Sequence, residues 1–136
     1  MMFNISHQHG TYDAIATPVR EAVRRGVTVR IIHDARTLKD IEGVRPTLRD
    51  MKQWGVDVRL ADIAALGKNA AGQYHAKALQ VDGEFLMVGS NNWTEAASHE
   101  NREAALLIRS RPLAAQFRSR FNADWSAFDG VRPFVQ

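Results

Sequence analysis

Hydrophobic residues recur along the first part of the chain with two spacings that alternate. Apolar residues stand at every fourth position between residues 12 and 25, which is typical of the buried face of an amphipathic helix, and Gly26 follows as a stop signal. The next apolar run, VTVRIIH over 27–33, is rich in β-branched side chains and predicts a buried strand. The other elements predicted here are a strand over 3–6, a helix over 46–54 opened by Pro46 and a strand over 56–60. Strands that alternate with helices pair in parallel, so this order predicts an α/β sheet covered by helices.

The second half of the chain has a different pattern. Small and polar residues over 61–73 predict a surface loop. Two strand-like runs over 73–81 and 84–90 then flank Asp82-Gly83, a dipeptide typical of a two-residue hairpin loop, and a further strand is expected over 102–109. The last helix begins near Pro112, and its apolar residues at four-residue spacing are interpreted as core packing: Leu113, Phe117, Phe121 and Trp125. No linker or repeat interrupts the chain, and we expect residues 1–136 to form a single domain.

Composition narrows the chemistry. The 136 residues include no cysteine, which excludes disulfides, thiolate metal sites and cysteine nucleophiles. Lys and Arg number 18 against 15 Asp and Glu, and the resulting net charge of +3 suits an anionic partner. The chain has no apolar run near the roughly 20 residues of a membrane span. It also has no secretory signal pattern, which together with the lack of cysteine favours a cytoplasmic location. We expect neither a metal site nor a cofactor.

The predicted hairpin gathers polar side chains at one place. With a two-residue loop, opposed positions add up to 165, so His75 faces Ser90. Side chains alternate along a strand, so Lys77 shares the face of His75, and Asn92 lies just past the end of the strand. An ammonium, a hydroxyl and an amide suit a phosphate, and an imidazole supplies a nucleophile or a proton. The sequence therefore predicts a site for an anion, specifically a phosphate.

The same residues resemble the HKD motif of the phospholipase D superfamily, in which H-x-K-x4-D is followed by x6-G-S-x-N. The string HAKALQVDGEFLMVGSNNWT matches in identity and spacing at six positions: His75, Lys77, Asp82, Gly89, Ser90 and Asn92. Downstream, Asn101 and Glu103 match the family's trailing N-x-E, and upstream RGVTVRIIHD is similar to the stretch that leads from helix to strand and ends in an Asp, here Asp34. The resemblance extends over residues 17–125. It is closest to members with a single motif, which include bacterial nucleases and mitochondrial cardiolipin hydrolases. The Cys-bearing insert of the mitochondrial branch is absent here, which argues against that subgroup.

The resemblance implies a metal-independent cleavage of phosphodiesters and assigns three groups of residues. The catalytic group comprises His75 as nucleophile or general acid, Lys77 as a phosphate ligand, and Glu103, which together with Ser90 would position the imidazole. The group expected to bind substrate comprises Ser90, Asn92 and Trp93. For Trp93, stacking on a base is one interpretation and packing between strand and helix is the other. The residues expected to shape the motif itself are Asp82, Gly83 and Gly89.

The family chemistry uses two copies of the motif. At the first step one imidazole must be neutral and the other protonated, so two histidines are needed. This sequence has one copy, because no other histidine is followed by a lysine two positions later. We therefore expect a homodimer with a shared site on its two-fold axis. The alternative is that this chain is a piece of a longer protein with two motifs.

The resemblance also implies the fold and narrows the function. We expect a mixed, mainly parallel α/β sheet flanked by helices, with the family's first strand and helix missing or shortened, since little sequence precedes the motif. The leading hypothesis is a nuclease with little sequence preference. The alternatives are a phospholipase D or phosphatidyl transferase acting on phospholipid head groups, and a phosphate- or nucleic-acid-binding module without turnover. Intact His75, Lys77 and Asn92 argue against the last of these.

Overall fold

The computed structural model describes residues 11–40, 43–67 and 72–130. Within these ranges the strands form two sheets, a parallel pair and an antiparallel sheet in the order β3-β4-β5. The strand bounds are β1 Arg30–Asp34, β2 Asp57–Ala61, β3 Ala78–Val81, β4 Phe85–Gly89 and β5 Ala105–Arg109. The predicted mixed α/β fold is confirmed. Its parallel part is the pair β1–β2, which a helical crossover joins, and the other strand pairs described are antiparallel.

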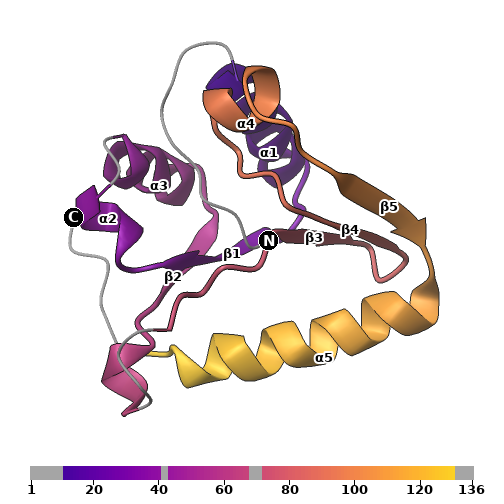
Figure 1. Cartoon of the computed structure of the whole chain (residues 1–136). Coiled ribbons are helices and arrows are strands. Elements are labelled where there is room, and N and C mark those ends of the chain that lie inside the picture. The colour runs from indigo at the N-terminus through magenta and orange to yellow at the C-terminus, as the bar shows by residue number, and fades with distance from the viewer. Residues whose placement is uncertain (1–10, 41–42, 68–71, 131–136) are drawn as a thin grey trace.

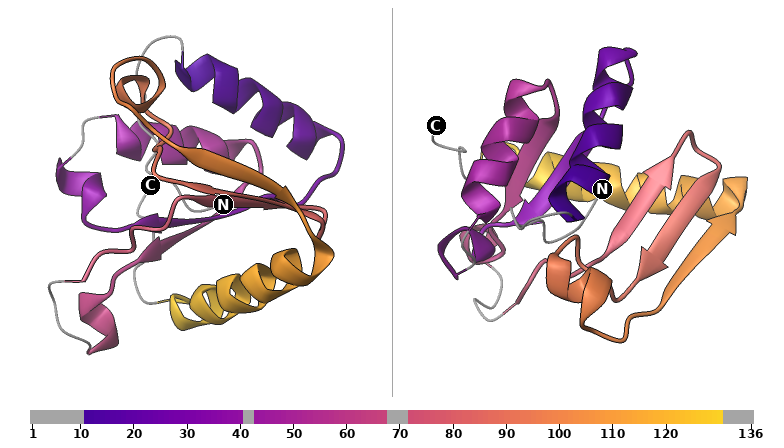
Figure 2. Two further views of the ribbon diagram at one scale, coloured as in Figure 1. Left: turned by 45° about the vertical axis from the view of Figure 1, so that its right-hand side comes forward. Right: turned by 90° about the horizontal axis from the view of Figure 1, so that it is seen from above.

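Helices cover both faces of these sheets. Their bounds are α1 Thr11–Arg24, α2 Thr37–Asp40, α3 Val44–Gln53, α4 Glu95–His99 and α5 Arg111–Ala127, with a 3₁₀ turn over Ala64–Leu66. Figure 1 shows α1 and α3 on one side of the strands and α5 crossing the opposite side, and the two views of Figure 2 agree. Each face of the strands therefore has its own hydrophobic core.

Strand β1 separates these two cores. Ile31 is fully buried with Val19, Met51 and Val56 on the side of α1 and α3. The next residue along the strand, Ile32, is fully buried on the side of α5. Because successive side chains point to opposite faces of a strand, a continuous apolar run such as VTVRIIH predicts burial on both faces. Packing on both faces thus fixes the position of β1 between the helices.

Helix α5 supplies the second core through the predicted aromatic stripe. Phe121 is buried, and Phe117 and Trp125 pack beside it. Leu113, the first member of the stripe, is 43% exposed, because it lies in the first turn of α5 where the chain leaves β5 at the edge of the sheet. The side chain of Ser110 caps this turn by accepting a hydrogen bond from Leu113 N at 3.4 Å.

The other predictions on elements have mixed outcomes. The helices expected over 12–25 and 46–54 are confirmed as α1 and α3 to within a few residues. The strand expected over 73–81 begins only at Ala78, the strand expected over 102–109 begins at Ala105, and α2 and α4 were not predicted. They have four and five residues, too short for a periodic pattern. The strand expected over 3–6 lies outside the described residues.

Candidate active site

The hairpin β3–β4 that carries the motif differs in register by one residue from the prediction. Its turn is tight, as expected: Asp82 and Gly83 have φ of 53° and 70°, and Glu84 N–H donates to Val81 O at 3.1 Å. In the ladder, however, Val81 pairs with Phe85, and Glu84 is left without a partner strand residue. The loop therefore has three residues instead of two, because Glu84 is inserted in the manner of a β-bulge.

This register corrects the expected pairing of His75 with Ser90. Gly89 N–H donates to Lys77 O at 3.1 Å, so Lys77 lies opposite Gly89. A slip of one residue exchanges the two faces of a strand, and the predicted contact is lost. Ser90 turns toward β5 instead, where its hydroxyl accepts a hydrogen bond from Ala104 N at 3.2 Å and donates to the carboxylate of Glu103.

His75 lies outside regular structure, in the extended segment that precedes β3. Its side chain is exposed, and within the described ranges no side chain donates to or accepts from its imidazole. The expectation that Ser90 and Glu103 hydrogen-bond to the ring is therefore not met in this structure. An exposed and unencumbered imidazole is accessible to a phosphate ester from solvent.

Lys77 is buried two residues further along. Its Nζ donates to the backbone oxygen of His75 at 3.0 Å, which ties the two motif residues together. Burial lowers the pKa of Lys77 below its ordinary value because it penalises the charged form, and the nearby negative charge of Glu103 opposes this effect. Lys77 is thus a partly desolvated cation next to an exposed imidazole, which is an arrangement suited to an anion.

Glu103 is the centre of a small polar cluster at the start of β5. Its carboxylate accepts hydrogen bonds from Ser90 and, at 3.1 Å, from Asn101 Nδ2. The hydrogen bonds from Ser90 and Asn101 lower the pKa of Glu103, and the charge of Lys77 adds to this. The motif residues Lys77, Ser90 and Glu103 are therefore connected, although the connection runs between Ser90 and Glu103 and not through the ring of His75.

The loop after β4 holds the remaining motif residues. The Oδ1 atoms of Asn91 and Asn92 are buried and have no hydrogen-bond partner among the described residues. Buried polar atoms are nearly always paired, and an amide oxygen accepts, so each of these two atoms lacks a donor. Trp93 packs against the core cluster of Val19 and Ile31, which agrees with the packing interpretation. Its contact with substrate stays a prediction.

A separate apolar cleft lies between α1 and the β3–β4 hairpin. It has a volume of about 670 Å³, and its walls include Ile15, Val19, Val29, Leu79, Met87 and Trp93. The turn residues Asp82 and Gly83 also line it, whereas His75, Lys77 and Ser90 do not. The turn thus lies away from the polar cluster, as expected for residues that shape the hairpin.

Gly89 allows the chain to pass the start of β5. A Cβ at this position would stand 2.5 Å from Ala104 O and 2.8 Å from Asn91 Oδ1. Because Ala104 O is a backbone atom that must shift to make room, we expect Gly89→Ala to lower the free energy of unfolding by about 1–3 kcal/mol. Urea unfolding checks this value, and an unchanged midpoint would show that the backbone yields without cost.

The charge of Glu103 supports the protonated state of Lys77. Glu103→Gln is expected to lower kcat by about 10-fold and to move the alkaline limb of the pH–rate profile to lower pH, since the pKa of Lys77 falls further without the carboxylate. The stabilising effect of Glu103 is present above its ordinary pKa of 4.5 and is lost as pH falls through its lowered pKa. The matched control is Glu84→Gln, which removes a carboxylate paired with Arg109 at 2.8 Å at the other end of the hairpin. An alkaline limb that stays in place would contradict the coupling.

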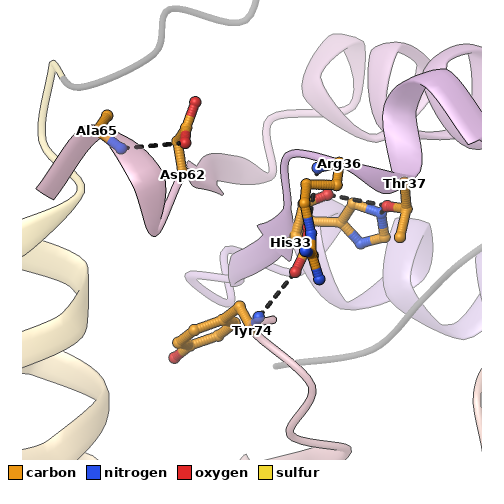
Figure 3. A network of polar contacts seen from close by, with 7 residues as sticks. His33, Arg36, Thr37, Asp62, Ala65 and Tyr74 are labelled. Carbon is orange, nitrogen blue, oxygen red and sulfur yellow. Dashed lines mark hydrogen bonds and ion pairs between the residues drawn. The ribbon is translucent and has the colours of Figure 1, made fainter. Parts of the chain in front are cut away.

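Sequence reasoning assigned no positioning role to two residues that hold this region, Asp34 and Tyr74. Buried Asp34, at the end of β1, accepts a hydrogen bond from the backbone N–H of Tyr74 at 2.7 Å (Figure 3). The position of Asp34 at the carboxyl end of a parallel strand was a signal, because side chains at this edge frequently face a binding site. The buried His33 beside it is a satisfied core residue: Thr37 Oγ1 donates to Asp34 O, so it accepts from His33 Nε2 at 2.7 Å.

Two features bear on membranes and metals. No helix in the described part of the chain is long and apolar enough to cross a bilayer. Residues 11–40, 43–67 and 72–130 also contain no group of three or more His, Asp or Glu side chains placed to hold a metal ion. The polar cluster described above contains one carboxylate, that of Glu103.

Comparison with known proteins places the chain in a family. Residues 2–125 match the family described as "Cardiolipin synthase, PLD-like domain". A mitochondrial cardiolipin hydrolase from Chlamydomonas reinhardtii is 35% identical over 122 residues, which cover 87% of this chain and 48% of that protein. The chain thus spans about half the length of this curated relative.

Solved structures show the same fold. Nuc from Salmonella typhimurium, a phospholipase D family member, is similar with a TM-score of 0.73 and 23% identity, over 93% of this chain and 76% of that chain. NucT from Helicobacter pylori is similar with a TM-score of 0.76 and 21% identity, over 93% and 78% of the two chains. The motif, the fold and the match over residues 2–125 together show that this chain belongs to the phospholipase D superfamily.

Proposed function

We propose that the chain is a metal-independent phosphodiesterase that cleaves nucleic acid through a phosphohistidine. The observation that carries this proposal is the juxtaposition of an exposed imidazole and a buried ammonium: Lys77 Nζ is bonded to the backbone of His75 itself. A phosphate that approaches the ring meets the cation at the same place. The partial desolvation of Lys77 strengthens its attraction for the charge of the transition state.

The reaction proceeds in two displacements. In the first, an imidazole nitrogen of His75 attacks phosphorus, the P–N bond forms, and the P–O bond to the leaving group breaks while a second imidazole gives its proton to the leaving oxygen. In the second, this imidazole takes a proton from water, the water oxygen attacks phosphorus and the P–N bond breaks. Lys77 and Asn92 stabilise the charged phosphoryl oxygens in both steps.

A second copy of the chain is proposed to supply the second imidazole. Leu106 and Leu107 on the edge strand β5 are 65% and 74% exposed, and they directly follow Ala105, which pairs with Gly89 at the polar cluster. Exposed leucines on an edge strand are a liability unless another surface covers them. A two-fold contact through this edge covers exposed leucine surface and brings two motifs toward one axis.

Light scattering tests this assembly, with twice the chain mass expected. Leu107→Asp is expected to shift the protein toward monomer and to reduce turnover in proportion, because a monomer lacks the second imidazole. Val27→Asp is the matched control, since Val27 is also exposed but lies between α1 and β1, outside the sheet that β5 belongs to. A monomeric wild-type protein with full activity would exclude the shared site.

Nucleic acid is favoured as substrate by the net charge of +3 and by exposed arginines on α1 and α5, including Arg20, Arg24, Arg118 and Arg120. A lipid substrate also has support, since one relative is called a cardiolipin hydrolase. Phospholipid is therefore the second candidate.

A substrate panel in EDTA separates the candidates. Single-stranded DNA, RNA, plasmid and vesicles that contain cardiolipin are each incubated with wild type and with His75→Ala. Cleavage of nucleic acid that persists in EDTA and depends on His75 is the expected result. Hydrolysis of cardiolipin without cleavage of any nucleic acid would make phospholipid the substrate class. Binding without turnover, equal in both proteins, would leave a binding module.

A further inference from the structure

Buried Asp34 connects strand β1 to the segment that carries His75. It ends β1, and its side chain is only 4% exposed. One carboxylate oxygen accepts from Arg36 N at 2.8 Å and the other accepts from Tyr74 N at 2.7 Å, across 40 positions of sequence (Figure 3). A buried carboxylate that accepts backbone N–H bonds is held in one orientation. Asp34 therefore fixes the backbone of the residue directly before His75.

Tyr74 is held at its other end by α5. Its hydroxyl donates to Asp124 Oδ2 at 2.9 Å, and its ring lies edge-on against buried Phe128 with centroids 5.5 Å apart. Burial, together with the charge of Asp124 and the hydrogen bond to it, raises the pKa of Tyr74, so the hydroxyl remains a donor. Asp124 is also paired with Arg120 at 3.2 Å. Tyr74 thus links β1 to α5 through three different contacts.

The sheet leaves His75 in need of such an anchor. Strand β3 begins at Ala78, and the hydrogen bond from Gly89 N to Lys77 O lies just ahead of it. His75 and the residue after it precede this bond and take no part in the ladder. Their path is therefore set by Lys77 on one side and by Tyr74 on the other.

We propose that Asp34 and Tyr74 are positioning residues, which place the imidazole of His75 for in-line attack without touching substrate. This inference rests on the proposed function. Displacement of a reacting group by about 1 Å costs on the order of 100-fold in rate, whereas substrate binding by other groups is unaffected. The signature of the anchor is a loss in kcat at constant KM.

The test compares Asp34→Ala with Asp34→Asn and with a matched control in the full chain. The substrate is bis(p-nitrophenyl) phosphate, which makes no demand on nucleic acid or lipid specificity. Asp62→Ala is the control, because Asp62 also follows a parallel strand and also accepts a backbone N–H, from Ala65 at 3.2 Å, but is not bonded to Tyr74 (Figure 3). Amide hydrogen exchange at Tyr74 reports the anchor independently of catalysis.

For Asp34→Ala we expect kcat to fall about 100-fold at unchanged KM, with exchange at Tyr74 at least about 10-fold faster. Asp34→Asn is expected to recover part of kcat. Its amide has one oxygen, which can replace one of the two carboxylate oxygens that accept from Arg36 N and Tyr74 N. Tyr74→Phe, which keeps the backbone bond and the ring contact, is expected to lose about 3-fold and serves where Asp34→Ala does not fold. Asp62→Ala is expected to behave as wild type.

Two outcomes would overturn the inference and remain distinct from a failure of the proposed function. Folded Asp34→Ala with wild-type kcat, or with unchanged exchange at Tyr74, would show that the anchor does not position His75. A drop of the same size in Asp62→Ala would show a general effect of losing a carboxylate at this edge. A wild-type protein without His75-dependent hydrolysis would instead reject the proposed function itself.

Discussion

Replacement of His75 by alanine is expected to lower kcat by about 10⁴-fold or more, because the variant has no atom that can form the bond to phosphorus. The side chain is exposed and makes no hydrogen bond within the described ranges, so its removal leaves the fold intact. Thermal unfolding should therefore be unchanged. Turnover of bis(p-nitrophenyl) phosphate in EDTA measures the loss, and rapid denaturation during turnover should trap a covalent adduct in wild type alone.

The matched control for this substitution is His99→Ala. His99 is exposed in the last turn of α4 and lies outside the motif. It should retain wild-type turnover. If His99→Ala abolished hydrolysis while His75→Ala retained it, the nucleophile would have been assigned to the wrong histidine.

Replacement of Lys77 by methionine is expected to have opposite effects on activity and on stability. Loss of the cation should lower kcat/KM by about 100- to 1000-fold, because the transition state loses a partly desolvated charge. Stability should hold or rise, since methionine fills a similar volume and burying the ammonium is unfavourable. The lowered pKa of Lys77 is the sign of that cost.

The pH dependence gives this prediction a definite sign. A lysine with a pKa below its ordinary value of 10.5 binds fewer protons in the folded state than in the unfolded state. The destabilisation is therefore complete below the folded pKa and disappears as pH rises toward 10.5. Activity changes in the reverse sense and is lost as Lys77 deprotonates.

Urea unfolding of wild type and Lys77→Met across this pH range measures the difference. The control is Lys52→Met, which removes an exposed lysine in the last turn of α3. A Lys77→Met protein that is both active and markedly less stable would mean that the ammonium is a structural group and not a ligand for phosphate.

Local sequence patterns were sufficient for most of the elements. Helices α1, α3 and α5 and strand β1 follow from hydrophobic spacing, from Gly26 and from the cap at Ser110, which all act within a few residues. The tight turn at Asp82-Gly83 follows from the same kind of signal. These features depend on backbone preferences and on the burial of one face, and residues close together in the sequence determine both.

The register of the hairpin shows the limit of this reasoning. Asp82-Gly83 fixed the turn, but Glu84 was left out of the ladder, where its backbone oxygen accepts from Ser110 N at 2.8 Å and its carboxylate pairs with Arg109. Both partners belong to the end of β5, far along the chain. The register of the hairpin is therefore decided by contacts with β5, and no pattern within the hairpin itself predicts it.

The sequence by itself determined the chemistry of this protein: which side chains form the motif, in what order, and on which kind of hairpin, since identity and spacing are properties of the chain. Only the tertiary structure decided how these side chains are held. In the folded chain Ser90 hydrogen-bonds to Glu103 instead of His75, and Lys77 is buried. Asp34 accepts from the backbone N–H of Tyr74, and Asp124 accepts from its hydroxyl. These contacts join residues 13 to 50 positions apart, and they form because β1, the hairpin and α5 pack around shared cores. Distances of this kind are set by packing, which depends on the whole chain at once.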